Sequence, residues 1–226
     1  MNWEDECYLL SKRKFRENAI IINAFTLNRG KVGGIVYGGT SRKIRNYLQI
    51  SNKLFIFHNS KNDNKIGYLK AELIKAVIPP FFNDKERTTA LISLCSLLNL
   101  LLPESQPYKN IYKSFEKFIN SIHLENWIIL YILFEINLIK ELGFDTNLKV
   151  FQKSDNELTE FKKIDIDGYI YEVPYYLISQ KIPDKLTNIL IRKSLIFTRS
   201  ILLNKFFIPN NLLFPKSRII LEKYFN

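Results

Sequence analysis

Residues 33–45 read GGIVYGGTSRKIR: a strand-like run enters a glycine-rich corner, and basic residues follow it. Glycine allows the backbone to come close to a ligand. Arginine side chains placed just after such a corner can pair with phosphates through their planar guanidinium groups. A second interpretation is a charged hairpin tip that only keeps a β-barrel soluble. The segment taken alone supports both interpretations equally.

The first 80 residues have the pattern of a small β-barrel. Short runs rich in β-branched and aromatic residues alternate with turn residues at 28–30, 38–41 and 59–64. Five strands with a glycine-rich bend fit a closed barrel, and the OB-fold is the commonest such barrel in nucleic-acid binding. Pro79 and Pro80 end the section. The expected strands cover residues 8–10, 19–25, 31–37, 46–57 and 66–76.

After the prolines, apolar residues recur at helical spacing. Asp84 is the expected N-cap of a helix that Pro103 stops, and Gly143 is the expected C′ residue of another. We therefore expect an α+β fold, with an OB-fold DNA-binding domain over residues 1–80. An all-helical domain over residues 81–226 follows, with an irregular or strand-like insert at 147–171. The expected helices cover residues 84–102, 108–122, 125–142, 185–206 and a short segment after Pro215.

The positive charge of the chain is concentrated in its first third. The 226 residues carry a net charge of +11, and residues 1–80 hold 14 Lys and Arg against 6 Asp and Glu, a net of +8. Such an excess is typical of a phosphate-binding module. An AT-rich genome would explain lysines scattered along the whole chain, but it does not explain why the arginines cluster near the N-terminus.

A second basic cluster, at residues 12–16, lies at the end of the first expected strand. In a five-stranded barrel it would share a face with Arg42 and Arg45, so that the two clusters form one strip. Phe15 and Tyr37 would stack on bases close to this strip, although most of the 17 phenylalanines must belong to the core. The candidate DNA contacts are Lys12, Arg13, Lys14, Arg16, Arg29, Lys31, Arg42, Lys43 and Arg45.

The sequence lacks the signatures of several other function classes. Cys7 and Cys95 belong to no Cys/His cluster, and only two histidines occur, so we expect a reducing compartment, no disulfide, no metal and no cofactor. Acidic residues at 4–6 and 165–172 lack a metal-binding spacing, and no Walker loop or nucleophile motif occurs. The apolar block at 127–134 is too short to span a bilayer, which takes about 20 residues. The sequence predicts a cytoplasmic protein that is not an enzyme and has no signal peptide.

Four groups of residues follow one another along nearly the whole chain. They are KRKFRE (12–17) with Thr26, Gly30, Gly38-Gly39, Ser41-Arg42 and Leu48-Gln49; LLLPE (100–104) with Pro107 and Tyr112; FE-x-x-L-x-x-ELGF (134–144); and FP-x-SR (214–218). In this order they resemble the RecO family of bacterial recombination mediators, and the second and third groups resemble its alphaproteobacterial members.

The resemblance implies a function as well as a fold. The fold would be an N-terminal OB-fold barrel followed by a helical domain. The function would be to bind single- and double-stranded DNA at the nucleoid and to anneal complementary strands. With RecR, the protein would help RecA to load on single-stranded DNA coated by the single-strand-binding protein (SSB).

Two departures from the family pattern concern zinc and SSB. Many family members carry cysteines of a zinc-finger-like insert where residues 147–171 of this chain have none, so no zinc is expected. Relatives often place an arginine before the Phe/Trp-Glu pair of the domain that receives the SSB tail, and here Leu133 occupies that position. The candidate contacts for the SSB tail are Lys140, Arg192 and Arg199.

Two other functions are compatible with the sequence. The first is a helical adaptor that recruits SSB or RecR and binds DNA only weakly. The second is an unrelated nuclease or ligase accessory built on an OB-fold, which is disfavoured because no metal-binding set of carboxylates is visible.

Overall fold

The computed structural model describes residues 2–60, 66–153, 160–183 and 185–226. The chain forms two compact units, Met1–Asn120 with Pro215–Arg218, and Ser121–Phe214 with Ile219–Asn226. The domain boundary expected at residue 80 stays a prediction. Within the described ranges, no helix is both long and apolar enough to cross a bilayer.

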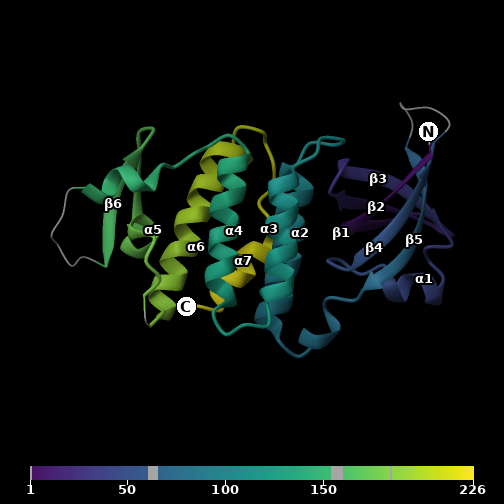
Figure 1. The fold of residues 1–226 in the computed structure, drawn as a ribbon, viewed down its shortest axis with the longest axis horizontal. Helices are drawn as coiled ribbons and strands as arrows, with labels where there is room; N and C mark the ends of the chain where they lie inside the picture. The colour runs from purple at the N-terminus through teal and green to yellow at the C-terminus, as the bar shows by residue number, and fades with distance from the viewer. Residues whose placement is uncertain (1, 61–65, 154–159, 184) are drawn as a thin grey trace. The chain divides into compact units, whose positions relative to one another are not determined.

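The first unit contains a closed barrel with strand order β1-β2-β3-β5-β4 (Figure 1), which confirms the predicted OB-like barrel. β3 and β5 close it by pairing in parallel, whereas the other neighbours are antiparallel. Alternate residues such as Leu9, Ile22 and Ile56 are fully buried inside, as the two-residue period of a strand requires. The strands are β1 (Asn2–Arg16), β2 (Ala19–Thr26), β3 (Gly30–Tyr37), β4 (Lys53–Asn59) and β5 (Gly67–Lys75).

Strand β1 is much longer than the three residues expected. Its first half pairs with β4, from Asn2 to Tyr8, and its second half pairs with β2, from Cys7 to Arg16. Charged residues in both halves hid this length from sequence patterning, because they lie on the solvent side of a strand that serves two neighbours. The basic residues 12–16 are therefore held on a regular strand.

The expectation of a strand over residues 46–57 was wrong in its first half. Residues Arg42–Tyr47 form a short helix, α1, and strand β4 begins only at Lys53. Ser41 is the N-cap, and its hydroxyl accepts a hydrogen bond from the Ile44 backbone N–H at 3.4 Å. Ile44 packs against the barrel core and Leu48 is buried in it, which is the spacing of a helix face. The turn expected at 59–64 lies outside the described residues from position 61 onward.

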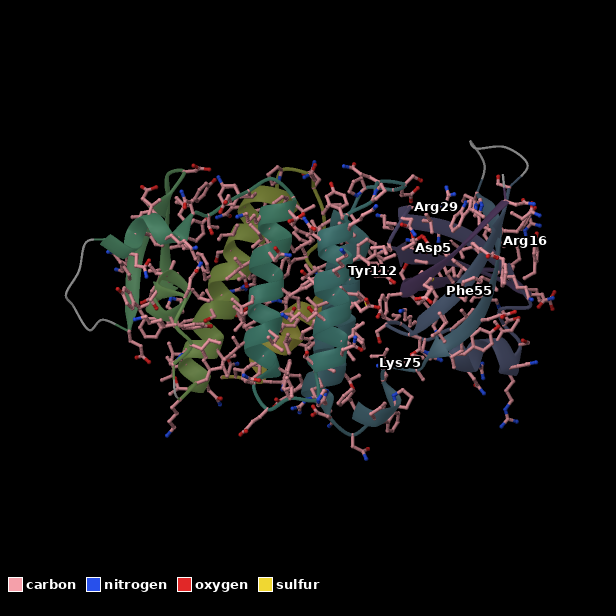
Figure 2. All side chains as sticks on the ribbon, viewed as in Figure 1. Asp5, Arg16, Arg29, Phe55, Lys75 and Tyr112 are labelled. Atoms are coloured by element: carbon pink, nitrogen blue, oxygen red, sulfur yellow. The ribbon has the colours of Figure 1, made fainter. Side chains whose placement is uncertain are left out.

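Helices α2 (Lys85–Leu101) and α3 (Lys109–Ser121) follow the barrel, as predicted. Asp84 caps α2 by accepting the backbone N–H of Arg87 at 2.9 Å, which confirms the predicted cap. On α3, the ring of Tyr112 lies 5.4 Å from that of Phe25 in β2 (centroid to centroid). In Figure 2, Tyr112 lies on the side of the barrel next to the helices and Arg16 at its far side. Arg16, the last residue of β1, therefore lies away from α2 and α3.

The second unit is mainly helical. Its two longest helices are α4 (Trp127–Glu141), which ends before the left-handed Gly143 as predicted, and α6 (Asn188–Leu202), which continues as a π-turn over Leu203–Phe207. The buried carboxylate of Glu135 accepts hydrogen bonds from the hydroxyls of Tyr131 at 2.9 Å and Thr198 at 2.5 Å, and so joins α4 to α6. The remaining elements are a 3-10 turn (Leu148–Lys153), the hairpin β6 (Phe161–Ile166) and β7 (Tyr169–Pro174), and α5 (Tyr175–Ser179). Helix α7 (Lys216–Lys223) has residues in both units.

Candidate nucleic-acid interface

A groove of about 1180 Å³ opens on the barrel, bounded by α1, β5 and the ends of β1, β3 and β4. Its lining contains six aromatic residues, two lysines and two glutamates. The acidic pair makes the groove less positive than the basic clusters beside it. Its aromatic and charged residues are Trp3, Tyr37, Tyr47, Phe57, His58, Tyr68, Lys43, Lys70, Glu4 and Glu72.

Two pairs of stacked rings lie in this groove. The Tyr37 and Tyr68 rings are 5.3 Å apart (centroid to centroid) with an interplanar angle of 29°. The Trp3 and His58 rings are 4.6 Å apart at 14°. Tyr37 and Tyr68 remain 52% and 47% exposed, whereas Trp3 packs partly against the barrel core. The tyrosine pair is therefore the open aromatic surface of the groove.

Strand register places the tyrosines together. Ile35 of β3 pairs in parallel with Tyr68 of β5, and Tyr37 lies two residues further along β3 on the same side. Along β5, buried Leu69 and Ala71 alternate with exposed Tyr68, Lys70 and Glu72. The parallel closure of the barrel thus creates this pair.

Charged side chains sit on both sides of the tyrosine pair. The hydrogen bond with Tyr68 raises the pKa of Tyr37, and the positive charge of the nearby Arg16 opposes that rise. On β5, the Lys70 ammonium lies 5.3 Å from the centre of the Phe57 ring and 2.9 Å from a Glu72 oxygen. The hydrogen bond to Glu72 raises the pKa of Lys70. A cation therefore flanks the aromatic surface at each end.

The structure brings part of the two predicted basic clusters together. The Lys12 ammonium donates to the carbonyl oxygen of Leu48 at 2.6 Å and to Gln49 Oε1 at 3.0 Å, both just after α1. Burial lowers the pKa of Lys12, and the positive charge of Arg45 lowers it further. Gln49, which accepts from Lys12, donates through Nε2 to the Arg45 carbonyl oxygen at 2.8 Å. The exposed members of the predicted strip are Arg13, Lys14 and Arg16 on β1 and Arg42, Lys43 and Arg45 on α1.

Lys31 and Arg29, also predicted as DNA contacts, have different surroundings from the exposed residues of the strip. Lys31 is only 9% exposed, and its ammonium donates to the Asn99 carbonyl oxygen at 2.8 Å, so we leave it out of the interface. The Arg29 guanidinium lies 4.7 Å from the centre of the Trp3 ring. Arg29 also lines a second groove of about 910 Å³, together with Lys12 and Arg13, and Trp3 and His58 line both grooves.

The glycine corner has a structural role that the sequence did not indicate. One of the two interpretations of this corner was that its glycines let a ligand come close to the backbone. A Cβ atom at Gly39 would instead lie 2.4 Å from Ile20 Cγ1 and 3.0 Å from the Val36 carbonyl oxygen. The space beside this glycine is therefore occupied by the barrel itself.

The three candidates for the SSB tail do not share one groove. Lys140 lines a groove of about 400 Å³ in the second unit with Leu133 and Lys149, and its ammonium lies 3.1 Å from Asp145 Oδ2. Arg199 Nε lies 3.1 Å from Glu222 Oε2. Arg192 is exposed on α6 and, like Arg199, is not part of the lining of that groove.

Five residues that line the groove were not predicted from the sequence: Trp3, Phe57, His58, Tyr68 and Lys70. The only local signal was the alternation of GYLKAEL at 67–73, in which aromatic and charged residues fall on one side of a strand. The residues described contain no group of three or more His, Cys, Asp or Glu side chains able to hold a metal ion. Burial raises the pKa of both thiols, Cys7 and Cys95.

Two family models match in tandem. Residues 1–77 match "Recombination protein O N terminal" and residues 83–168 match "Recombination protein O C terminal". A protein of Wolbachia pipientis wMel named "DNA repair protein RecO" is 32% identical over 150 residues, 66% of this chain and 62% of the relative. One of the same name from Cereibacter sphaeroides is 30% identical over 148 residues, again 66% and 62%. The matched part of the chain thus spans less than two thirds of the length of these relatives.

Proposed function

Because the chain belongs to the recombination protein O (RecO) family of DNA repair proteins, we propose that its barrel binds single- and double-stranded DNA and promotes annealing of complementary strands. With RecR, it would assist the loading of RecA on single-stranded DNA coated by SSB. It would act at the nucleoid in the cytoplasm, without catalysis or a cofactor. The observation that supports this best is the basic end of β1, which meets the basic helix α1 beside an aromatic groove.

The charges account for binding to either form of DNA. Phosphates are the same on single and double strands, so lysine and arginine side chains contribute affinity without regard to sequence. None of the residues of α1 is buried, so Arg42, Lys43 and Arg45 can reach a phosphate backbone without rearrangement of the barrel. Affinity should therefore fall steeply as salt concentration rises.

Replacement of Arg42, Lys43 and Arg45 together by alanine tests this proposal. We expect weaker binding to a fluorescein-labelled oligonucleotide in an anisotropy titration at moderate salt, for single strands and duplexes alike. The thermal melt should stay nearly unchanged, because the three side chains are exposed.

The matched control removes the same charge from another exposed surface of the same unit. Lys109, Lys113 and Lys117 lie four residues apart on α3 and are exposed, so they face one side of that helix. Their triple alanine variant should bind DNA like the unmodified chain. Equal losses in both variants would show that only total charge matters and would contradict a DNA site at α1.

A second candidate function is an adaptor that captures the SSB tail. It is favoured by the groove of about 400 Å³ in the second unit, in which apolar Leu133 and Ile182 lie beside Lys140 and Lys149. An acidic peptide with an apolar end suits such a groove. The adaptor hypothesis predicts that a fluorescent SSB C-terminal peptide binds more tightly than oligonucleotides do, and that Lys140→Ala with Lys149→Ala removes this binding.

A further inference from the structure

We propose that the Tyr37–Tyr68 pair and the Phe57 ring form a stacking surface for the bases of unpaired DNA, which gives the barrel a contact with single strands that a duplex cannot make. The inference rests on the proposed DNA-binding function and adds to it a selection for one form of DNA. Three properties of the rings support it: their exposure, their order across the barrel and the charges around them.

The exposure of the two tyrosines is the first argument. Large apolar side chains on a barrel surface are normally scattered singly, but Tyr37 and Tyr68 come from different strands and stack on each other while about half exposed. Neither ring fills the core. The pair presents to solvent a broad apolar surface made of π-systems, which is the kind of surface on which nucleobases stack.

The order of the rings across the barrel is the second argument. Tyr37, Tyr68 and Phe57 belong to β3, β5 and β4, which are consecutive neighbours in the barrel. Tyr68 pairs with Asn59 and Phe57 pairs with Lys70, so Tyr68 and Phe57 are diagonal neighbours on one face, about 7–8 Å apart. The three rings thus form a row across the strands, along which successive bases of an extended strand can lie.

The flanking charges are the third argument. Arg16 pairs with Ala19 across β1 and β2, and Ala19 pairs with Tyr37 across β2 and β3, so Arg16 lies at the Tyr37 end of the row. Lys70 lies at the other end, with its ammonium 5.3 Å from the centre of the Phe57 ring. A strand whose bases stack on the rings would have a cation for its phosphates at each end of the row. Two carboxylates are unfavourable at this end of the row: Glu72, which pairs with Lys70, and Glu4, which lies opposite Phe57 across β1 and β4 and lines the same groove.

Base stacking would explain a preference for single strands over duplexes. In a duplex, both faces of each internal base are covered by neighbouring base pairs, so rings on a protein surface cannot stack on them. An unpaired base offers its π-face whatever its sequence. Phosphate contacts at β1 and α1 would hold both forms of DNA, and the aromatic row would add affinity for the single strand only.

The test uses the full chain with Tyr37→Ala and Tyr68→Ala combined. Its affinity is measured by anisotropy for three probes of about 16 nucleotides, the upper site size of one OB-fold. The probes are a thymidine single strand, the same length of duplex, and an abasic single strand that keeps the phosphates. We expect a loss of about tenfold or more for the thymidine strand and little change for the duplex and the abasic strand.

Two control variants complete the design. Tyr37→Phe with Tyr68→Phe keeps both rings and should bind the thymidine strand like the unmodified chain. Phe82→Ala removes an aromatic side chain that is 80% exposed outside the groove and should have no effect. Unchanged thermal melts confirm that the barrel is intact in each variant.

Three results would overturn the inference, and they can be told apart from failure of the proposed function. An equal loss for all three probes would mean that the tyrosines support backbone binding. An unchanged thymidine affinity would mean that no base stacks there, while a loss in the Arg42, Lys43 and Arg45 variant would still support DNA binding at α1. No loss in either variant would contradict both proposals.

Discussion

The ammonium nitrogen of Lys12 lies 2.6 Å from the carbonyl oxygen of Leu48, so the basic end of β1 is bonded to the residue that follows α1. This contact joins two segments that the sequence places 36 residues apart. It also brings the charge of Lys12 close to that of Arg45. Lys12 therefore has a structural role besides any contact it makes with phosphate.

Replacement of Lys12 by methionine should lower the stability of the barrel. The change removes a charge-assisted hydrogen bond, and we expect a loss of about 1 kcal/mol in the free energy of unfolding, measured by urea denaturation. Lys14→Met is the control, because Lys14 is exposed on the same strand and its loss removes the same charge. Equal stability of the two variants would show that the Lys12–Leu48 bond contributes nothing measurable.

The salt dependence of binding should reveal the phosphate contacts of α1. For the unmodified chain, the logarithm of the association constant should fall linearly with the logarithm of salt concentration. Loss of Arg42, Lys43 and Arg45 should make that slope less steep by about 2–3, one for each phosphate contact removed. A lower affinity with an unchanged slope would instead indicate that the variant disturbs the site without losing ionic contacts.

Removal of the negative charge of Glu72 should strengthen single-strand binding. Glu72 pairs with Lys70 at 2.9 Å at the end of the aromatic row. Glu72→Gln frees that ammonium for a phosphate and removes a repulsion, so we expect affinity for a thymidine strand to rise about two- to fivefold. Glu86→Gln, which changes an exposed glutamate on α2, should leave the affinity unchanged, and a decrease with Glu72→Gln would contradict the assignment.

The sequence predicted those features that depend on neighbouring residues. The cap at Asp84 and the end of α4 before Gly143 were found because caps are set by one or two side chains. Helix α1 was missed because Tyr47, Leu48 and Ile50 also suit a strand. Its signal was Ser41 at the N-cap.

The aromatic groove could be predicted only in part from the sequence, because its residues come from strands that are distant in the chain. Tyr37 was singled out because it adjoins the glycine corner, but its partner Tyr68 comes from β5. Their meeting depends on the parallel pairing of β3 with β5, which is a property of barrel closure and not of either segment. Trp3 and His58 likewise meet only through the pairing of β1 with β4.

The cap at Asp84 should make stability depend on pH. Burial alone would raise the pKa of this carboxyl, but hydrogen bonds from the backbone and side chain of Arg87 lower it overall. A lowered pKa in the folded state means that the stabilisation is present above the unfolded value of about 3.9 and is lost as pH falls through the folded one. Asp84→Ala should therefore reduce the free energy of unfolding by about 1 kcal/mol at pH 7, and less at pH near 3. Asp84→Asn, which keeps a capping oxygen, should lose less at pH 7, and a difference that does not shrink in acid would contradict this role of the carboxylate.

The two glycines of the corner should respond to substitution in opposite ways. Gly38 has a φ of +68°, and a Cβ there would meet only Ile44 Cδ1, at 3.5 Å, so its requirement is conformational. Asparagine adopts this backbone more readily than alanine does, so Gly38→Asn should be the milder change. At Gly39 the requirement is space, because a Cβ would lie 2.4 Å from Ile20 Cγ1. There Gly39→Ala should lower the free energy of unfolding by about 1–3 kcal/mol, and the larger Gly39→Asn by more.

Urea denaturation of these four variants measures the order directly. A reversal of the ranking of asparagine and alanine between Gly38 and Gly39 is the expected result, because a conformational requirement favours asparagine and a steric one favours the smaller side chain. The same ranking at both positions would show that one of the two requirements is absent. If Gly39→Ala were as stable as the unmodified chain, Ile20 would have to move aside, and the backbone at the corner would then be open enough for the ligand approach that the sequence suggested.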